Sequence, residues 1–175
     1  MSIIKSNLKK TFKIVLDSNQ TASFTGNQFD ATYTVDLTKI LPDQIDFERP
    51  YEMTFMFRSR AGTGLTTLLD QSTVYTLCIE MGKGFNVISS TPSRNIVGIL
   101  PVNNDFTAYT STNCPSFWDC KASDNESVLI RDLTGVTNIR LTVIRADTNN
   151  VFNSINDGTV NTNTKYICVL SLKQL

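Results

Sequence analysis

An all-β fold, an antiparallel two-sheet β-sandwich, is the fold class that the sequence predicts. Three observations predict it. Apolar and polar residues alternate with a period of two in segment after segment, long polar connections separate the segments, and no stretch of ten or more residues shows the 3.6-residue period of a helix. Eight or nine strands are expected, spaced roughly 15 to 25 residues apart. A simple meander needs fewer residues between its strands. We therefore expect the chain to cross between two sheets, as it does in a single jelly roll.

The strand expected over residues 50–59 is the central element. Tyr51, Met53, Phe55 and Phe57 lie on one side of its period-two pattern, and the residues between them lie on the other. So much apolar surface would be unfavourable at an edge that is open to water. We therefore expect a central strand whose inward side forms the floor of the core.

Two strands are expected before it, at residues 11–17 and 30–37, with a polar loop at 18–29 between them. Each has one apolar side: Phe12, Ile14 and Leu16 in the first, and Ala31, Tyr33, Val35 and Leu37 in the second. Residues 1–10, with three lysines, are expected to be an N-terminal arm, either disordered or docked on a neighbour. No linker or composition shift divides residues 11–175, so a single domain is predicted.

The rest of the chain repeats the pattern. Strands are expected at residues 74–81, 95–100, 127–131, 138–145 and 165–172, with Tyr75, Leu77 and Ile79 inward in the first and Ile139, Leu141 and Val143 inward in the fourth. Gly82–Gly84 is interpreted as a turn that ends a strand, and residues 101–126 and 147–164 as loops. Residues 38–49 contain a proline and are too short for more than a helical turn.

The composition favours a protein whose flanks are covered by neighbours over a freely diffusing enzyme. Only 18% of the 175 residues are charged, against about 25% in an average soluble domain. Thr, Ser and Asn make up the difference, so the surface is polar but nearly uncharged. Sixteen basic residues balance sixteen acidic ones, and direct nucleic-acid binding is not expected.

The sequence contains no histidine. This excludes His-based acid–base catalysis, Ser-His and Cys-His nucleophile pairs and every metal site that uses imidazole. Cys78 and Cys168 lie in apolar strands and are expected to be buried free thiols. Cys114 and Cys120 are either paired or free, and their spacing is not that of a zinc site. Assembly in a reducing, intracellular compartment is expected.

No catalytic residue, cofactor site or metal site is predicted. Two clusters of acidic residues are candidates for an acid–base pair or a calcium site, namely Asp43, Asp46 and Glu48, and Asp119, Asp124 and Glu126. The first lacks a glycine at an EF-hand position and the second has no regular ligand spacing, so solvated loop charges are the favoured interpretation. Met81–Phe85 contains two glycines and a lysine but lacks the spacing of a phosphate-binding loop. No apolar run is long enough for a membrane span.

Phe117 and Trp118 are the candidate ligand or interface aromatics. In a loop of a β-sandwich such rings form a sugar-stacking platform, seal one end of the sandwich, or fill a pocket on a neighbouring subunit. A role in the core or in an interface is the favoured interpretation.

Residues 12–18, 31–37 and 51–57 carry a resemblance to a known family. A first strand ends in Leu-Asp-Ser, a polar loop follows, and a Tyr-x-Val-Asp-Leu strand leads to an aromatic-rich strand. This resembles the single jelly-roll capsid proteins, of minor capsid or penton type, of double-stranded DNA viruses of algae and protists, including virophages and polinton-like viruses. The motifs form sheets and contain no catalytic residue, and the likeness weakens beyond Gly84.

The resemblance implies a structural component of an icosahedral virus capsid and not an enzyme. Its expected partners are copies of itself, most simply in a pentamer, and other capsid proteins. It would be located in the virion, after assembly inside the host cell, and would take no small-molecule substrate. The alternative is a ligand-binding β-sandwich, such as a carbohydrate-binding or receptor-binding domain. The two classes differ in that a binding module presents an exposed aromatic platform, whereas a capsid component buries its surface in symmetric contacts.

Overall fold

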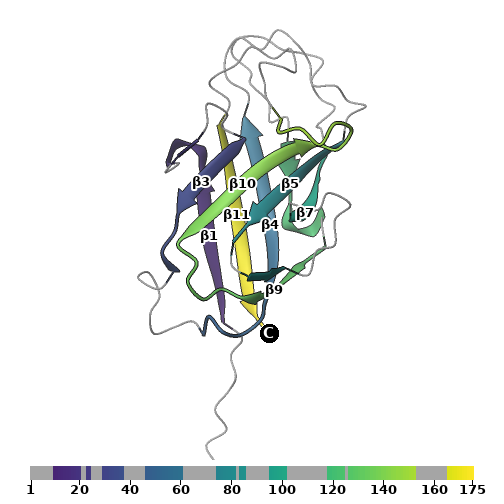
Figure 1. The fold of residues 1–175 in the computed structure, drawn as a ribbon. Coiled ribbons are helices and arrows are strands. Elements are labelled where there is room, and N and C mark those ends of the chain that lie inside the picture. The colour runs from purple at the N-terminus through teal and green to yellow at the C-terminus, as the bar shows by residue number, and fades with distance from the viewer. Residues whose placement is uncertain are drawn as a thin grey trace, which may run out of the picture.

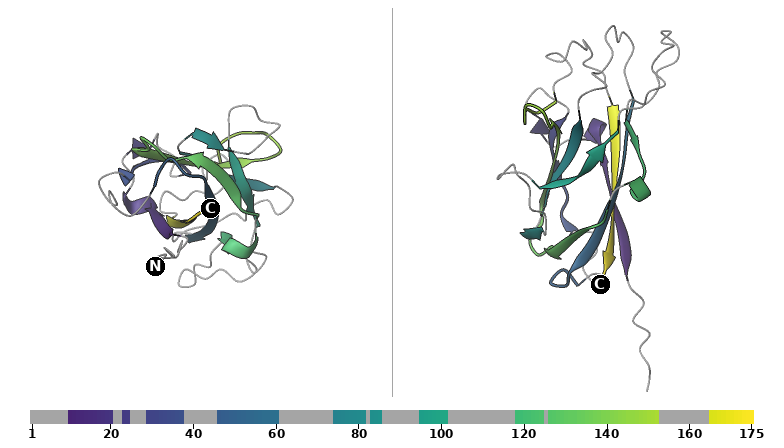
Figure 2. Two further views of the ribbon diagram at one scale, coloured as in Figure 1. Left: turned by 90° about the horizontal axis from the view of Figure 1, so that it is seen from below. Right: turned by 90° about the vertical axis from the view of Figure 1, so that its right-hand side faces the viewer.

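Two antiparallel β-sheets pack face to face in the computed structural model (Figures 1 and 2). The residues described are 10–20, 23–24, 29–37, 46–60, 74–81, 83–85, 95–101, 118–124, 126–152 and 165–175. We name the sheet that contains the first strand sheet A and the other sheet B.

Sheet A contains six strands: β1 (Thr11–Asp17), β4 (Tyr51–Arg60), β6 (Lys83–Phe85), β8 (Trp118–Cys120), β9 (Val128–Asp132) and β11 (Lys165–Gln174). Its order is β1-β11-β4-β9-β6, and β8 also pairs with β4. Sheet B contains five strands: β2 (Ser23–Phe24), β3 (Asp30–Thr34), β5 (Tyr75–Glu80), β7 (Ile96–Leu100) and β10 (Asn138–Arg145). Its order is β2-β3-β10-β5-β7. Two short 3-10 helices, η1 (Ser18–Gln20) and η2 (Ala122–Asp124), complete the described elements.

The strand order is that of a single jelly roll. Eight strands have five or more residues. They form two sets of four, β1-β11-β4-β9 facing β3-β10-β5-β7, so that strands distant in the sequence become neighbours. The chain passes repeatedly between the sheets, as the wide strand spacing indicated. The predicted fold class is confirmed.

Strand β4 is central in sheet A, as predicted. It pairs with β11 along its full length on one side and with β8 and β9 on the other. Its inward side chains, Tyr51, Met53, Phe55 and Phe57, are each at most 2% exposed. They pack against the inward residues of sheet B, which include Leu77 and Leu141, so the row does form the floor of the core.

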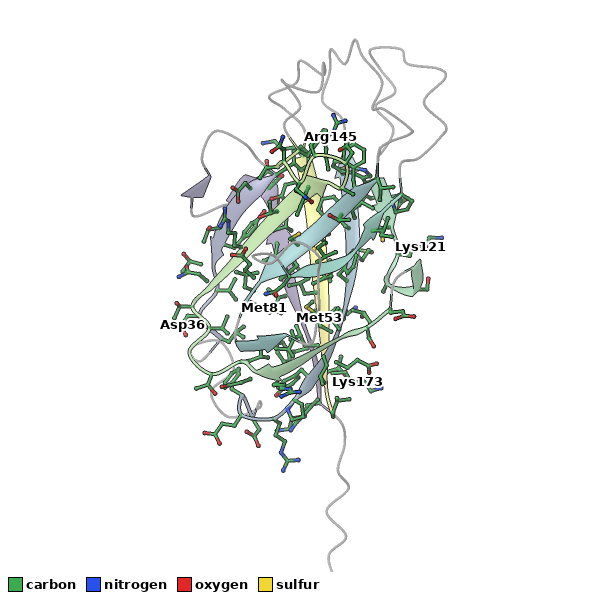
Figure 3. All side chains as sticks on the ribbon, turned by 45° about the vertical axis from the view of Figure 1, so that its right-hand side comes forward. Asp36, Met53, Met81, Lys121, Arg145 and Lys173 are labelled. Carbon is green, nitrogen blue, oxygen red and sulfur yellow. The ribbon has the colours of Figure 1, made fainter. Side chains whose placement is uncertain are left out.

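The alternation predicted in the other long strands is also observed. The inward residues named from the sequence are buried or packed against the core: Phe12, Ile14, Leu16, Ala31, Tyr33, Val35, Leu37, Tyr75, Leu77, Ile79, Ile139, Leu141 and Val143. Figure 3 shows the same division at single residues, with Met53 and Met81 between the sheets and Lys121 and Lys173 on the outside.

The turn predicted over Gly82–Gly84 is wrong at Lys83 and Gly84, and Gly82 lies outside the described residues. Lys83–Phe85 form strand β6, which pairs with β9 through the positions Lys83↔Asp132 and Phe85↔Ile130. The chain leaves sheet B after β5 and joins the end of sheet A, where the backbone groups of β6 find hydrogen-bond partners. The sequence does not reveal this because three residues are too few for a period-two pattern.

Other boundaries differ more modestly. The predicted strand 30–37 ends as β3 at Thr34, although the N–H of Val35 still donates to the carbonyl of Thr137 (2.9 Å). The loop predicted at 101–126 contains β8 and η2, and the loop at 18–29 contains η1 and β2. The helical turn expected within 38–49 falls largely outside the described residues, as do residues 1–9 of the expected arm.

Candidate interaction surface

Trp118 is an interior residue of the sandwich. It lies in β8 and its side chain has no exposed area. Its ring packs edge-on against Phe29, Phe152 and Tyr75, with ring centroids 5.4, 5.1 and 5.3 Å away. Such a ring is not an exposed stacking platform, and the structure places Trp118 in the core. Phe117 lies outside the described residues.

Phe29 and Phe152 complete this aromatic cluster, and sequence analysis missed both. Phe29 directly precedes β3, Phe152 follows the turn after β10, and both are at most 1% exposed. The backbone of Val143 in β10 holds them, because its N–H donates to the carbonyl of Phe29 (2.9 Å) and its carbonyl accepts from the N–H of Phe152 (2.8 Å). An aromatic residue inside a polar segment was the only signal in the sequence.

Two buried tyrosines link the sheets through their hydroxyl groups. Tyr33 in β3 donates to Tyr166 in β11, with 2.7 Å between the oxygens. Burial raises the pKa of Tyr33 to about 12, and burial together with the neighbouring Tyr33 raises the pKa of Tyr166. Both therefore stay protonated at neutral pH. The pair acts as a polar link across the core, and its raised pKa values oppose a role as a general base.

The described cysteines, Cys78, Cys120 and Cys168, are buried and form no disulfide with one another. Cys168 faces the core from β11, and burial raises its pKa. Cys120 also faces the core, where its Sγ lies 3.8 Å from the carbonyl oxygen of Ile99. Cys78 alternates with inward residues of β5 and so lies on the outer face of sheet B. A thiol whose pKa is raised is a poor nucleophile at neutral pH. Cys114 lies outside the described residues.

The two clusters of acidic residues do not form a metal or acid–base site among the described residues. Asp46 forms an ion pair with Arg49 (3.1 Å), and Asp119 forms one with Arg58 (3.0 Å). Within the described part of the chain, no three metal-ligating side chains gather in one place. Asp43 lies outside the described residues. The interpretation as solvated charges fits Asp46 and Asp119, since both ion pairs are at the surface.

The outer face of sheet A carries an apolar patch that sequence analysis did not find. Val15, Ile167, Val169 and Met56 form this outer-face patch. Val15 is 60% exposed, Ile167 44% and Met56 41%. The register aligns Val15 with Val169 and Val169 with Met56, so three strands place apolar side chains in one row, and Ile167 lies two residues along β11.

The rows on both sides of the patch contain polar and charged residues. The row two residues away toward the C-terminal end of β11 holds Lys13, Ser171 and Thr54. In the opposite direction Ile167 lies between Asp17 and Arg58, and Arg58 pairs further with Asp119. The arrangement has an apolar centre and polar edges, which is the usual anatomy of a protein–protein interface.

The patch could not be found strand by strand. One outward valine or methionine in a strand is ordinary, because much of any protein surface is apolar. Only the pairing of β1, β11 and β4 brings side chains from positions 15, 56, 167 and 169 together. Such a cluster is a recognised sign of an interaction site.

Comparisons with known proteins do not assign the chain to a family. Neither a scan of protein-family models nor searches of curated proteins and solved structures gave a match. Among the described residues, no helix has the length and apolar character needed to cross a membrane. The function therefore has to be argued from the chain's own residues.

Proposed function

We propose that this protein is a structural component of an icosahedral virus capsid, of minor capsid or penton type. It acts by association with copies of itself and with other capsid proteins, without catalysis. The proposal includes a closed homo-oligomer, with a pentamer as the simplest ring, and a location in the virion.

The strand order is the observation that carries the proposal. The sets β1-β11-β4-β9 and β3-β10-β5-β7 form a jelly roll, an architecture shared by viral capsid proteins, lectin domains and cupins. Cupin-type metal sites are commonly built on histidine, which this sequence lacks. The likeness of residues 12–57 to viral jelly rolls favours the capsid class within the remaining architectures.

The described interior also favours a structural role. Its aromatic rings pack against one another, its tyrosine hydroxyl pair is neutral, and its thiols are buried. Outside, the exposed apolar side chains of sheet A offer a surface for contacts between proteins. A structural protein needs both features, a well-packed core and a surface that binds other proteins.

The structure does not support the main residue on which the ligand-binding alternative depended. This alternative required an aromatic platform at Phe117 and Trp118, and the indole ring of Trp118 is fully buried. We therefore keep the capsid class as the conclusion.

The test is the state of the purified full-length chain. Light scattering coupled to gel filtration should give five times the 19.5 kDa of one chain, or a multiple of that mass where rings associate further, and negative-stain images should show closed rings. A further arm is binding to a capsid preparation of a candidate virus, with an unrelated β-sandwich of similar mass as control. A protein that stays monomeric and does not bind capsids, but binds glycans on an array, would contradict the proposal and support the ligand-binding class.

A further inference from the structure

We infer that the outer face of sheet A is a two-fold symmetric interface between two copies of this chain. The patch Val15, Ile167, Val169 and Met56 forms its centre. This inference goes beyond the proposed function, because two copies can pair through this face whether or not the chain belongs to a capsid. The inferred interface uses the broad outer face of sheet A, whereas the proposed ring would form through the sides of the sandwich.

The geometry of the face permits close packing of two sheets. β1, β11 and β4 pair without a register shift, so the outward side chains stand in regular rows. Two such faces pack with their strands nearly aligned, about 10 Å apart. Three strand widths of about 4.8 Å and ten residues of about 3.3 Å give roughly 475 Å² of flat area. That is more than half of the ~800 Å² per partner in a stable interface.

A two-fold axis parallel to the strands and over β11 matches apolar groups with apolar groups. Under this operation Val169 faces Val169 of the second copy, and Ile167 faces its own equivalent. β1 of one copy lies over β4 of the other, so Val15 faces Met56 of the second copy, and the same contact occurs twice. An axis across the strands would instead place Ile167 on Ser171, an apolar group on a polar one.

The charges at the edge of the patch agree with the same axis. Asp17 lies in the row of Arg58, on the other side of β11. The two-fold places Asp17 of one copy opposite Arg58 of the second copy, twice per interface. Arg58 is 63% exposed despite its ion pair with Asp119, so it retains donors for a second carboxylate. Lys13 comes to lie over uncharged Thr54. At the two ends of β11 the axis brings Lys165 and Lys173 opposite their own equivalents, and Lys173 is held toward Glu52 by an ion pair (3.6 Å). The complementary charges of the face are therefore those of the row that contains Asp17 and Arg58.

The first experiment compares two lysine substitutions in the full-length protein. Val15→Lys places a charge in the inferred interface, and Ile99→Lys is the control on sheet B. Both residues are aliphatic and lie in edge strands, β1 of sheet A and β7 of sheet B, and their side chains are similarly exposed, at 60% and 56%. Light scattering over a concentration series should show Val15→Lys weakening pairing by roughly a hundred-fold, because an isologous interface buries each new charge twice. Ile99→Lys should leave pairing unchanged. At a concentration where all three proteins are monomers, both variants should melt like the parent.

The second experiment tests the position of the axis. In a Cys114→Ser background, Val169→Cys should be joined into a covalent two-chain species by a short bismaleimide, because the two thiols project toward each other between sheets about 10 Å apart. Ile99→Cys in the same background should stay a single chain. Cross-linking of Val169→Cys together with weakened pairing of Val15→Lys supports the inference.

Three results would overturn it. They are a parent protein without any paired species, equal effects of the two lysine substitutions, and equal cross-linking at positions 99 and 169. A ring that forms without a cross-link at position 169 would overturn this interface and leave the proposed function standing.

Discussion

At the scale of single residues, burial decides which side chains matter and for what. Trp118, Phe29 and Phe152 lie outside the long strands yet fill the space between the sheets. Met56, inside the central strand, is partly in water. A residue's place in a regular strand is therefore a poor guide to its contribution, and its phase and neighbours are better ones.

Phe55→Ala should destabilise the fold by about 3–5 kcal/mol, because a phenyl ring that is 2% exposed leaves a cavity in the core. Met56→Ala, the next residue on the opposite face, should cost much less, since its side chain is 41% exposed. Urea unfolding of both variants measures the difference, at a protein concentration where the chain is a monomer. Equal losses would show that the inward and outward phases of β4 are misassigned.

The Tyr33–Tyr166 pair predicts a non-additive result. Tyr33→Phe or Tyr166→Phe alone should cost about 1–3 kcal/mol, because each leaves the other buried hydroxyl without its partner. The double variant should cost less than the sum of the two, since neither hydroxyl then remains. Urea unfolding of the four proteins forms the cycle. Strictly additive values would mean that the 2.7 Å contact contributes nothing.

The same pair predicts loss of stability at high pH. The pKa of Tyr33 rises from 10.0 in the unfolded chain to about 12 in the folded one. Between these values the folded state binds more protons than the unfolded state, so the free energy of unfolding falls as pH rises, by about 1.4 kcal/mol per pH unit for this group. Below pH 10 the contribution is fully present. Unfolding measured from pH 8 to 11.5 should be less pH-dependent in Tyr33→Phe, and identical profiles would contradict this.

At the scale of elements, strand pairing brings together what the sequence keeps apart. β1 and β11, from opposite ends of the chain, pair over seven positions, and β11 then pairs with β4 over ten. A strand's own alternation indicates which side chains share a face but not which strand lies beside it. The outer-face patch results from the pairing of β1, β11 and β4. The short strands β6 and β8 are likewise defined by their pairing with β9 and β4.

The strand phases predict that Cys78 and Cys168 do not form a disulfide. Cys168 points between the sheets from β11, while Cys78 points away from them on β5. The sheets lie about 10 Å apart, beyond the ~7 Å limit between the Cα atoms of a disulfide. Alkylation and mass spectrometry without reductant should find both thiols free, slow to react in the native protein and fast in urea. A linked Cys78–Cys168 peptide would contradict the assigned faces.

At the scale of the whole molecule, the first and last described residues lie close together. The N–H of Gln174 donates to the carbonyl of Lys10 (2.9 Å), and the N–H of Leu175 donates to the carbonyl of Pro50 (3.1 Å). Figure 1 shows the C-terminus at the end of the sandwich where β1 begins. Lys10, the first described residue, therefore lies beside the C-terminal end of β11 in sheet A.

Removal of residues 1–9 should weaken assembly of the proposed ring while leaving the melting transition of the fold close to that of the parent. Lys10 and its contact with Gln174 are retained, so β1 keeps its pairing with β11. Light scattering and thermal unfolding measure the two effects separately. A control in which Ile3, Ile4 and Leu8 are replaced by serine tests whether apolar contacts of the arm are responsible. A large fall in melting temperature on truncation would show that the arm belongs to the fold.

The sequence by itself determined the fold class, the long strands and the inward rows, because a period-two pattern is a local property of the chain. Residues 11–17 and 138–145 were predicted with the boundaries of β1 and β10. The absence of histidine, a property of composition, equally needed no structure to exclude whole classes of chemistry.

Only the tertiary structure decided how the strands pair, where Trp118 points and which outward residues meet. These depend on contacts between positions more than a hundred residues apart, such as Tyr33 with Tyr166 and Val15 with Val169. Such contacts are chosen by the packing of the whole core, because each strand alone fits many partners. The candidate interaction surface depends on such contacts. The sequence shows each of its residues, but only the pairing of the strands makes them neighbours.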